Sequence, residues 1–270
     1  MMSISGIFSG LEQVHVLVFV AALSMARMVG LMILMALFTR ARIAGLLRNG
    51  VAIALSIPLM PLLYKTVIDT EIGPIMMVAL GMKEMLLGAT LGFIMSLPFW
   101  AAEAAGDIVD LQRGVTMGSL IDPMMTHETS ITGTLFSIIM IVIFLSLGGL
   151  LLMLDIVYTS YRLWPVDQFI PVFRAQSITL FLNLCTRIVT MALALAFPLI
   201  VGLLLSDILL ALVSRAAPHL NIFAMSLAVK SFSFTVLLLL YAAFLLTYLK
   251  GELSFFGEIN QLLEGLVDVR

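Results

Sequence analysis

Long apolar runs separated by short polar segments dominate this sequence. A helix needs roughly 20 largely apolar residues to cross a bilayer. Three runs free of charged residues approach or exceed that length: 129–154, 188–206 and 231–249. Three more carry charges or prolines inside an apolar stretch: 14–38, 43–64 and 75–102. The pattern therefore predicts an all-α, multi-helix integral membrane protein with six spans.

The third charged run predicts a helix that is too long for a bilayer alone. If residues 75–112 form one helix, it is about 57 Å long at a rise of 1.5 Å per residue. A bilayer core is about 30 Å thick. We expect a kink at Pro98, with the part after it leaving the lipid. We therefore expect an all-α fold that is built from long, kinked helical hairpins. The last twenty residues predict a short amphipathic helix with Phe255, Phe256 and Ile259 on its apolar face.

Composition supports the membrane assignment and narrows the chemistry. The chain of 270 residues is 62% hydrophobic and 11% charged, with a mean hydropathy of +1.17. A net charge of -2 gives no basic footprint for nucleic acid. Cys185 is the single cysteine, and the three histidines have no metal-ligand spacing. His127 begins an H-E-x-x-H pattern, but Ile131 replaces the second histidine. We therefore expect no enzyme activity, no metal and no cofactor.

Ionisable residues inside or beside the apolar runs are the candidate functional residues. A charge facing lipid costs roughly 2.5–3.5 kcal/mol even on the mildest insertion scale, so these groups must face protein, water or each other. We expect lone charges to pair across helices or subunits. The groups are Arg27, Lys83, Glu84, Glu103, Asp107, Asp110, Arg113, Arg187, Asp207 and Lys230.

Three carboxylates share one helical face and have two readings. Glu103, Asp107 and Asp110 are spaced i, i+4 and i+7. Clustered carboxylates have coupled titrations, which suits a proton or cation path. In the other reading the face is solvated or paired, because Arg113 lies three residues after Asp110. The sequence leaves both readings open and favours the second.

Small residues and methionines add two further patterns. Gly88 and Gly92 form a G-x-x-x-G pair, which favours close approach of another helix. Met117, Met124 and Met125 lie in an otherwise polar loop. Because methionine is flexible, these three either form a deformable seal or fill ordinary core space.

Several motifs, in a fixed order, resemble one family. They are Glu84-x-x-x-Gly88-x-x-x-Gly92-Phe93, the run from Ala105 to Gly114 (AGDIVDLQRG), Asp122-Pro123, the run from Arg215 to Phe223 (RAAPHLNIF), Lys230 and Phe256-x-Glu258-Ile259-x-x-Leu262-Leu263. From Arg27 to the tail the chain resembles the FliR-type subunit of type III secretion export gates, called the T component in injectisomes. The Gln112-Arg113-Gly114 triplet is more similar to the injectisome branch than to the flagellar one.

The resemblance implies a structural pore subunit that conducts unfolded proteins across the inner membrane of a Gram-negative bacterium and projects into the periplasm. It implies assembly with R-type and S-type subunits into a helical hetero-oligomeric gate, and contact with a U-type switch subunit. It also implies that residues 1–270 form one export-gate domain, in which about 1–174 resemble an R-type subunit and about 175–265 an S-type helical hairpin.

The resemblance also assigns residues to roles. The implied pore plug comprises Met117, Leu120, Ile121, Asp122, Pro123, Met124 and Met125. The implied buried polar or assembly residues are Arg27, Lys83, Glu84, Glu103, Asp107, Asp110, Gln112, Arg113, Asn221 and Lys230. The implied helix-packing residues are Gly88, Gly92, Gly106 and Gly114. The rival interpretation is a polytopic secondary transporter or ion-conducting membrane protein, which internal repeats with broken helices would favour; we find no convincing repeat.

Overall fold

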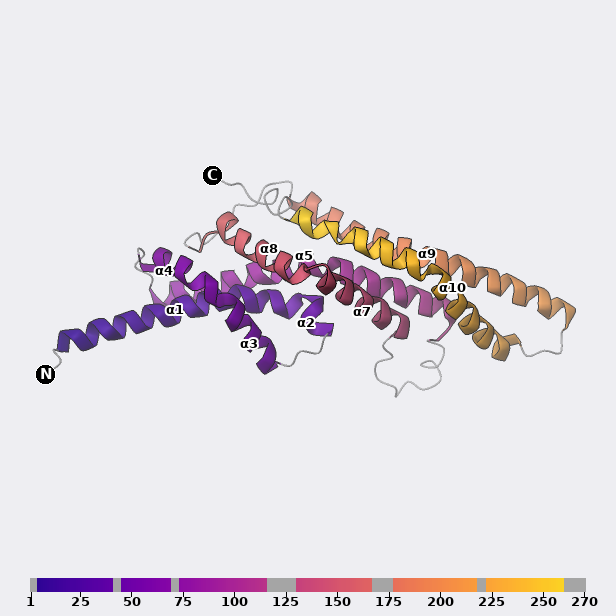
Figure 1. The fold of residues 1–270 in the computed structure, drawn as a ribbon, viewed down its shortest axis with the longest axis horizontal. Helices are drawn as coiled ribbons and strands as arrows, with labels where there is room; N and C mark the ends of the chain where they lie inside the picture. The colour runs from indigo at the N-terminus through magenta and orange to yellow at the C-terminus, as the bar shows by residue number, and fades with distance from the viewer. Residues whose placement is uncertain are drawn as a thin grey trace. The chain divides into compact units, whose positions relative to one another are not determined.

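The described part of the chain is helical throughout. The computed structural model describes residues 4–40, 45–68, 73–115, 130–166, 177–217 and 222–259, and no strand occurs within these ranges. The helices are α1 (Ile4–Leu34), α2 (Ala36–Arg40), α3 (Gly45–Ser56), the 3-10 turn η1 (Ile57–Leu59), α4 (Met60–Ile68), α5 (Pro74–Arg113), α7 (Ile131–Ser146), α8 (Gly149–Leu163), α9 (Ser177–Ala216) and α10 (Ile222–Glu252) (Figure 1). The prediction of an all-α protein with several long apolar helices is confirmed.

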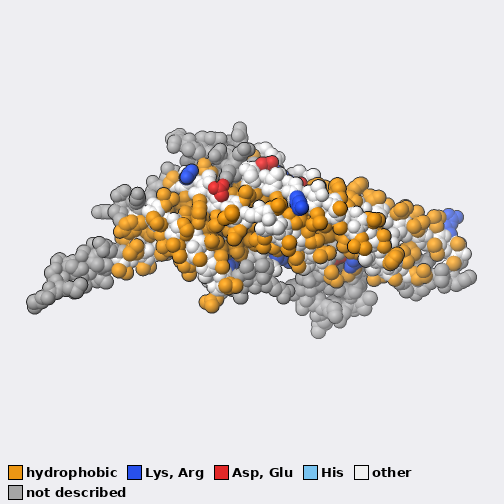
Figure 2. Space-filling model, in the orientation of Figure 1, with side chains coloured by type: hydrophobic (Ala, Val, Ile, Leu, Met, Phe, Trp, Pro, Cys, Tyr) orange, Lys and Arg blue, Asp and Glu red, His pale blue; other side chains and the backbone are white. Residues whose placement is uncertain are grey.

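Five of the described helical segments are long and apolar enough to cross a membrane: 16–34, 45–64, 75–113, 178–216 and 225–259. A sixth results if α7 and α8 together count as one broken span. This upper count agrees with the predicted six spans. In the view of Figure 2 most exposed side chains are hydrophobic and few are charged. The protein is therefore embedded in a membrane.

The chain divides into two compact units, each assembled from separate stretches. The first unit comprises residues 1–96, 148–182 and 255–270, and the second comprises 97–147 and 183–254. The helix α5 is continuous through Pro98 and contributes to both units. The predicted kink at Pro98, and the predicted R-like and S-like parts, stay predictions.

In the first unit α1 and α5 run parallel, with their main chains in direct contact. A Cβ at Gly88 would overlap the carbonyl oxygen of Arg27, and one at Gly92 would overlap that of Leu31. On the facing helix, a Cβ at Gly30 would overlap the carbonyl oxygen of Met85. Because partner numbers rise together along both helices, the pair is parallel. Glycine on both helices is what permits this approach.

The chain between these two parallel helices folds back along α1. Both α3 and α4 pack against α1. Pro58 and Pro61 separate α3 from α4, because each lacks the N–H that would continue the helical ladder. At the break between α1 and α2, the hydroxyl oxygen of Ser96 accepts the N–H of Ala36 at 2.8 Å. A serine on α5 thus replaces a backbone partner that the break removes.

In the second unit α9 and α10 form an antiparallel hairpin (Figure 1). The main-chain oxygen of Leu195 accepts a hydrogen bond from Tyr241 at 3.2 Å. Further along α9, Gly202 lies against the side chain of Leu237, where a Cβ would overlap it. Contacts on α10 move toward its N-terminus as those on α9 move toward its C-terminus, which fixes the antiparallel direction.

One prediction about local structure is wrong. The apolar run 129–154 is not one helix: α7 ends at Ser146 and α8 begins at Gly149, with Gly148 between them at φ 78°. Only glycine adopts this left-handed conformation without steric cost, so the Gly148-Gly149 pair ends the first helix. Gly114 follows α5 with a φ of 85°, a conformation that ends the helix. Its assignment to helix packing stays a prediction.

Alanine substitutions at two glycines of α5 test whether the main chains of α1 and α5 are in direct contact. We expect Gly88→Ala to destabilise the protein by about 1–3 kcal/mol or more, because the new methyl meets main-chain atoms that have no rotamer to change. Gly81→Ala is the matched control, since nothing described lies within 4 Å there and alanine is the better helix former. Thermal unfolding of both purified variants measures the difference. Equal stability of the two would contradict the close α1–α5 contact.

Candidate functional site

Glu84 joins two cations in the first unit, a group of three residues that we call the buried ion cluster. The Nε of Arg27 on α1 lies 2.6 Å from Oε2 of Glu84, and the Nζ of Lys83 lies 2.9 Å from Oε1. The side chains of Arg27 and Glu84 are 0% exposed, and that of Lys83 is 8% exposed. Each carboxylate oxygen therefore has its own cationic partner.

Groups in and just after the last turn of α8 accept further hydrogen bonds from the two cations. Arg27 donates through Nη1 to the hydroxyl of Ser160 at 2.8 Å and through Nη2 to the carbonyl oxygen of Trp164 at 3.0 Å. Lys83 donates to the carbonyl oxygens of Pro165 and Val166 at 3.1 and 3.0 Å. Two cations share one carboxylate, and the C-terminal end of a helix carries partial negative charge that stabilises the extra cation.

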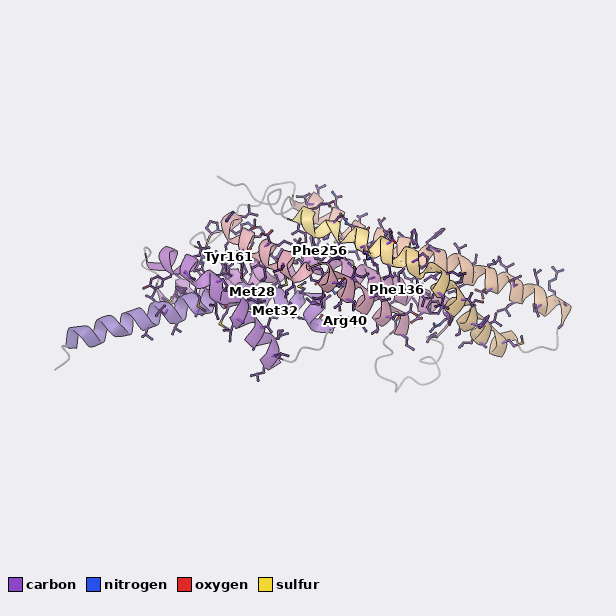
Figure 3. All side chains as sticks on the ribbon, viewed as in Figure 1. Met28, Met32, Arg40, Phe136, Tyr161 and Phe256 are labelled. Carbon is purple, nitrogen blue, oxygen red and sulfur yellow. The ribbon has the colours of Figure 1, made fainter. Side chains whose placement is uncertain are left out.

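An aromatic ring completes the enclosure of Arg27. Its guanidinium carbon lies 3.6 Å from the ring centroid of Tyr161 on α8, a residue labelled in Figure 3. Such a cation–π contact is stronger when water is excluded. The buried ion cluster thus binds α1, α5 and α8, three helices far apart in the sequence, at one point of the first unit.

The second polar group lies in the second unit, where α5 ends and α7 begins; we call it the loop-base cluster. Its centre is Asp110, which is 1% exposed. One carboxylate oxygen accepts from the hydroxyl of Ser130 at 2.7 Å and from the N–H of Thr132 at 2.9 Å. The other accepts from the Thr132 hydroxyl at 2.6 Å and lies 3.3 Å from Nη2 of Arg113. Both oxygens are therefore fully occupied.

The same end of α5 is attached to the α9–α10 hairpin. Lys230 on α10 forms an ion pair with Asp207 on α9 at 2.7 Å and donates to the carbonyl oxygen of Gln112 at 3.3 Å. The guanidinium of Arg113 lies 4.8 Å from the ring centroid of Phe234 on α10. A cation beside a C-terminal carbonyl complements the helix dipole of α5.

The three clustered carboxylates differ in how deeply they are buried. Asp110 is buried, whereas Glu103 and Asp107 are only partly exposed to solvent. Asp107 lies against Gly133 on α7, where a Cβ would overlap its Oδ1. The expected pair between Asp110 and Arg113 is confirmed at 3.3 Å. Whether this face also carries protons stays open.

Most of the expected pairing of lone charges occurs inside the chain. Arg27 pairs with Glu84, Asp207 with Lys230, and Arg187 with Glu252 at 3.3 Å. The prediction of pairing across helices is confirmed for these groups. The seven implied plug residues and Asn221 lie outside the described residues.

Sequence reasoning missed the uncharged members of both groups. Ser130 and Thr132 bind Asp110, Ser160 binds Arg27, and Gly30 and Gly133 permit close helix contacts. One local signal existed: Ser130 directly precedes an apolar run, which is typical of an N-cap. Its hydroxyl accepts the N–H of Gly133 at 2.8 Å, as such a cap does.

This fold and these clusters define the class: an all-α membrane protein whose buried charges form ion pairs and hydrogen bonds that link separate segments of the chain. Residues 18–255 match the family model described as "Bacterial export proteins, family 1". The match covers well over half of the chain, so the chain belongs to this family of bacterial export proteins.

Curated relatives agree with this membership. The chain is 39% identical to "Yop proteins translocation protein T" of Yersinia pestis over 73% of this chain and 75% of that protein. It is 34% identical to "Secretion system apparatus protein SsaT" of Salmonella typhimurium, over 82% and 85% respectively. Identity to "Flagellar biosynthetic protein FliR" of Bacillus subtilis is 27%, over 70% and 74%. The predicted FliR-type recognition, nearer to the injectisome branch, is confirmed.

Removal of Glu84 tests the buried ion cluster. We expect Glu84→Ala to destabilise the folded protein by about 3–5 kcal/mol, because it leaves two buried cations without their shared carboxylate. Glu252→Ala is the matched control, since its partner Arg187 is 39% exposed and an exposed pair contributes at most about 1 kcal/mol. Thermal unfolding in detergent, with the amount of folded protein, measures both. Similar losses in the two variants would refute a special role for Glu84.

Proposed function

We propose that the protein is a structural pore subunit of a type III secretion export gate, which conducts unfolded proteins across the bacterial inner membrane. The observation that carries this proposal is the family match over residues 18–255, together with relatives named as translocation and secretion-apparatus proteins. In this proposal the chain is a structural component of the apparatus, with no reaction and no cofactor of its own. Because the chain is more similar to the injectisome branch, we propose that this secretion serves virulence.

Its partners are R-type and S-type gate subunits and a U-type switch subunit, together with lipid and the exported chains. The described surface supports such an assembly. On α10, Phe232 is 73% exposed and Leu240 77%, and on α9 Phe197 is 66% exposed. Apolar surface of this extent requires lipid or partner helices to cover it. Lys83, Glu84 and Lys230 have partners within the chain, so the exposed apolar faces rather than these charges create the need for partners.

Within this proposal, the segment after α5 forms the plug. The sequence places Met117, Leu120, Ile121, Met124 and Met125 in it as an apolar set, with Asp122 and Pro123 between Ile121 and Met124. A ring of apolar side chains blocks ions by excluding water from a constriction. Methionine also adapts its shape to different passengers. We place the complex in the inner membrane, projecting toward the periplasm.

Purification from the native membrane tests the assembly. We expect the chain to come out in a fixed complex, with R-type and S-type subunits identified by mass determination. Produced alone, it should aggregate, because apolar faces of α9 and α10 then lack partners. A monodisperse, thermally stable and active monomer would instead support the transporter interpretation.

Polar substitution in the plug tests closure. We expect replacement of Leu120, Ile121, Met124 and Met125 by Ser to increase ion leak across the membrane by an order of magnitude or more, because a polar constriction stays hydrated. Leak is measured with the full complex present and its assembly verified. Met82→Ser is the control, since Met82 is a 64% exposed methionine on α5. Unchanged leak in an intact complex would remove this segment from the gate.

A further inference from the structure

The two described chain ends that flank residues 116–129 are joined by one side chain. Asp110 lies in the last turn of α5, and Ser130 and Thr132 begin α7. Three hydrogen bonds of 2.6–2.9 Å cross from the second segment to this carboxylate.

These bonds also complete the N-terminus of α7. The Ser130 hydroxyl donates to Asp110 while accepting the N–H of Gly133 at 2.8 Å. The N–H of Thr132 belongs to the first turn, where helical N–H groups have no partner within the helix. Asp110 supplies that partner, and its negative charge faces the positive end of the α7 dipole. Charge-assisted bonds of this kind are about twice as strong as neutral ones.

One turn before Asp110, the backbones of the two helices touch. A Cβ at Gly106 would overlap the main-chain atoms of Gly133 and Thr132, and one at Gly133 would overlap Asp107. The start of α7 therefore cannot slide along α5 without steric overlap. The contact of main chains and the bonds to Asp110 constrain the same two segments independently.

The end of α5 is itself held by the hairpin. Arg113 packs over Phe234, and Lys230 donates to the carbonyl oxygen of Gln112. The end of α5 that binds the start of α7 is therefore also in contact with the α9–α10 hairpin. Arg113 contributes only one of the contacts of Asp110, at 3.3 Å, while three others remain without it.

We propose that Asp110 is a positioning residue that fastens both ends of the 116–129 segment to a single point. The end of α5 and the start of α7 therefore stay together while an exported chain passes. This inference rests on the proposed function for the role of the segment. The fastening itself rests on the described contacts of Asp110 alone.

Hydrogen exchange in the assembled export gate tests the fastening. In Asp110→Asn, amides of residues 130–134 should exchange about 10- to 100-fold faster than in the wild type, because charged hydrogen bonds to the first turn of α7 weaken. Thr132→Val and Ser130→Ala each remove one donor and should give smaller increases. Arg113→Ala should increase exchange less than Asp110→Asn. Glu252→Gln, the same chemical change at another ion pair of the second unit, should leave these amides unchanged.

The outcomes separate the fastening from the gate. Unchanged exchange at 130–134 in Asp110→Asn would overturn the proposal, as would equally faster exchange throughout the second unit, which indicates general destabilisation. If Asp110→Asn prevents assembly, the Thr132→Val variant decides the question by the same readout. Faster local exchange with no added ion leak would support the fastening and contradict the plug. Faster exchange accompanied by leak would support both.

Discussion

A buried charge inside an apolar helical protein must find an opposite charge and enough hydrogen-bond partners, and the first unit is organised by this constraint. Glu84 forms ion pairs with two cations at once, and carbonyl groups after α8 accept further hydrogen bonds from both cations. Because these partners belong to α1, α5 and α8, satisfying one charge fixes three helices. The ion cluster therefore specifies an arrangement that the non-directional attraction between apolar helices leaves undetermined.

Close backbone contact is the second constraint, and it acts together with the first. Gly88 and Gly30 bring α1 and α5 close enough for Arg27 to reach Glu84. Gly106 and Gly133 do the same for α5 and α7, next to the carboxylate of Asp110. In both units the small residues and the polar cluster lie within about two turns of each other on α5. Polar groups in this protein are thus placed where the main chains already approach.

The sequence was sufficient for the class of fold and for the charged members of each cluster. Apolar runs are long and their length is set by the bilayer, so the spans could be located from hydropathy. Charges such as Arg27 and Lys230 stand out in apolar stretches of the sequence, so their pairing was predictable. The uncharged partners of these charges were harder to predict. In the sequence Ser160 and Thr132 look like ordinary helix residues, and only the fold brings them next to Arg27 and Asp110. The break at Gly148 was missed because a pair of glycines scarcely lowers the hydropathy of the run.

The two kinds of contact between helices differ in what a second mutation can repair. Asp207 and Lys230 meet through side chains, so exchanging the two charges restores an attractive pair, and a lesion at one site has suppressors at the other. Gly88 meets the main-chain carbonyl of Arg27, an atom group that every residue possesses. No change of side chain on α1 can make room for a larger residue there. In a genetic screen, lesions at the glycine should revert only at their own codon, whereas lesions in the ion pairs should yield suppressors on other helices.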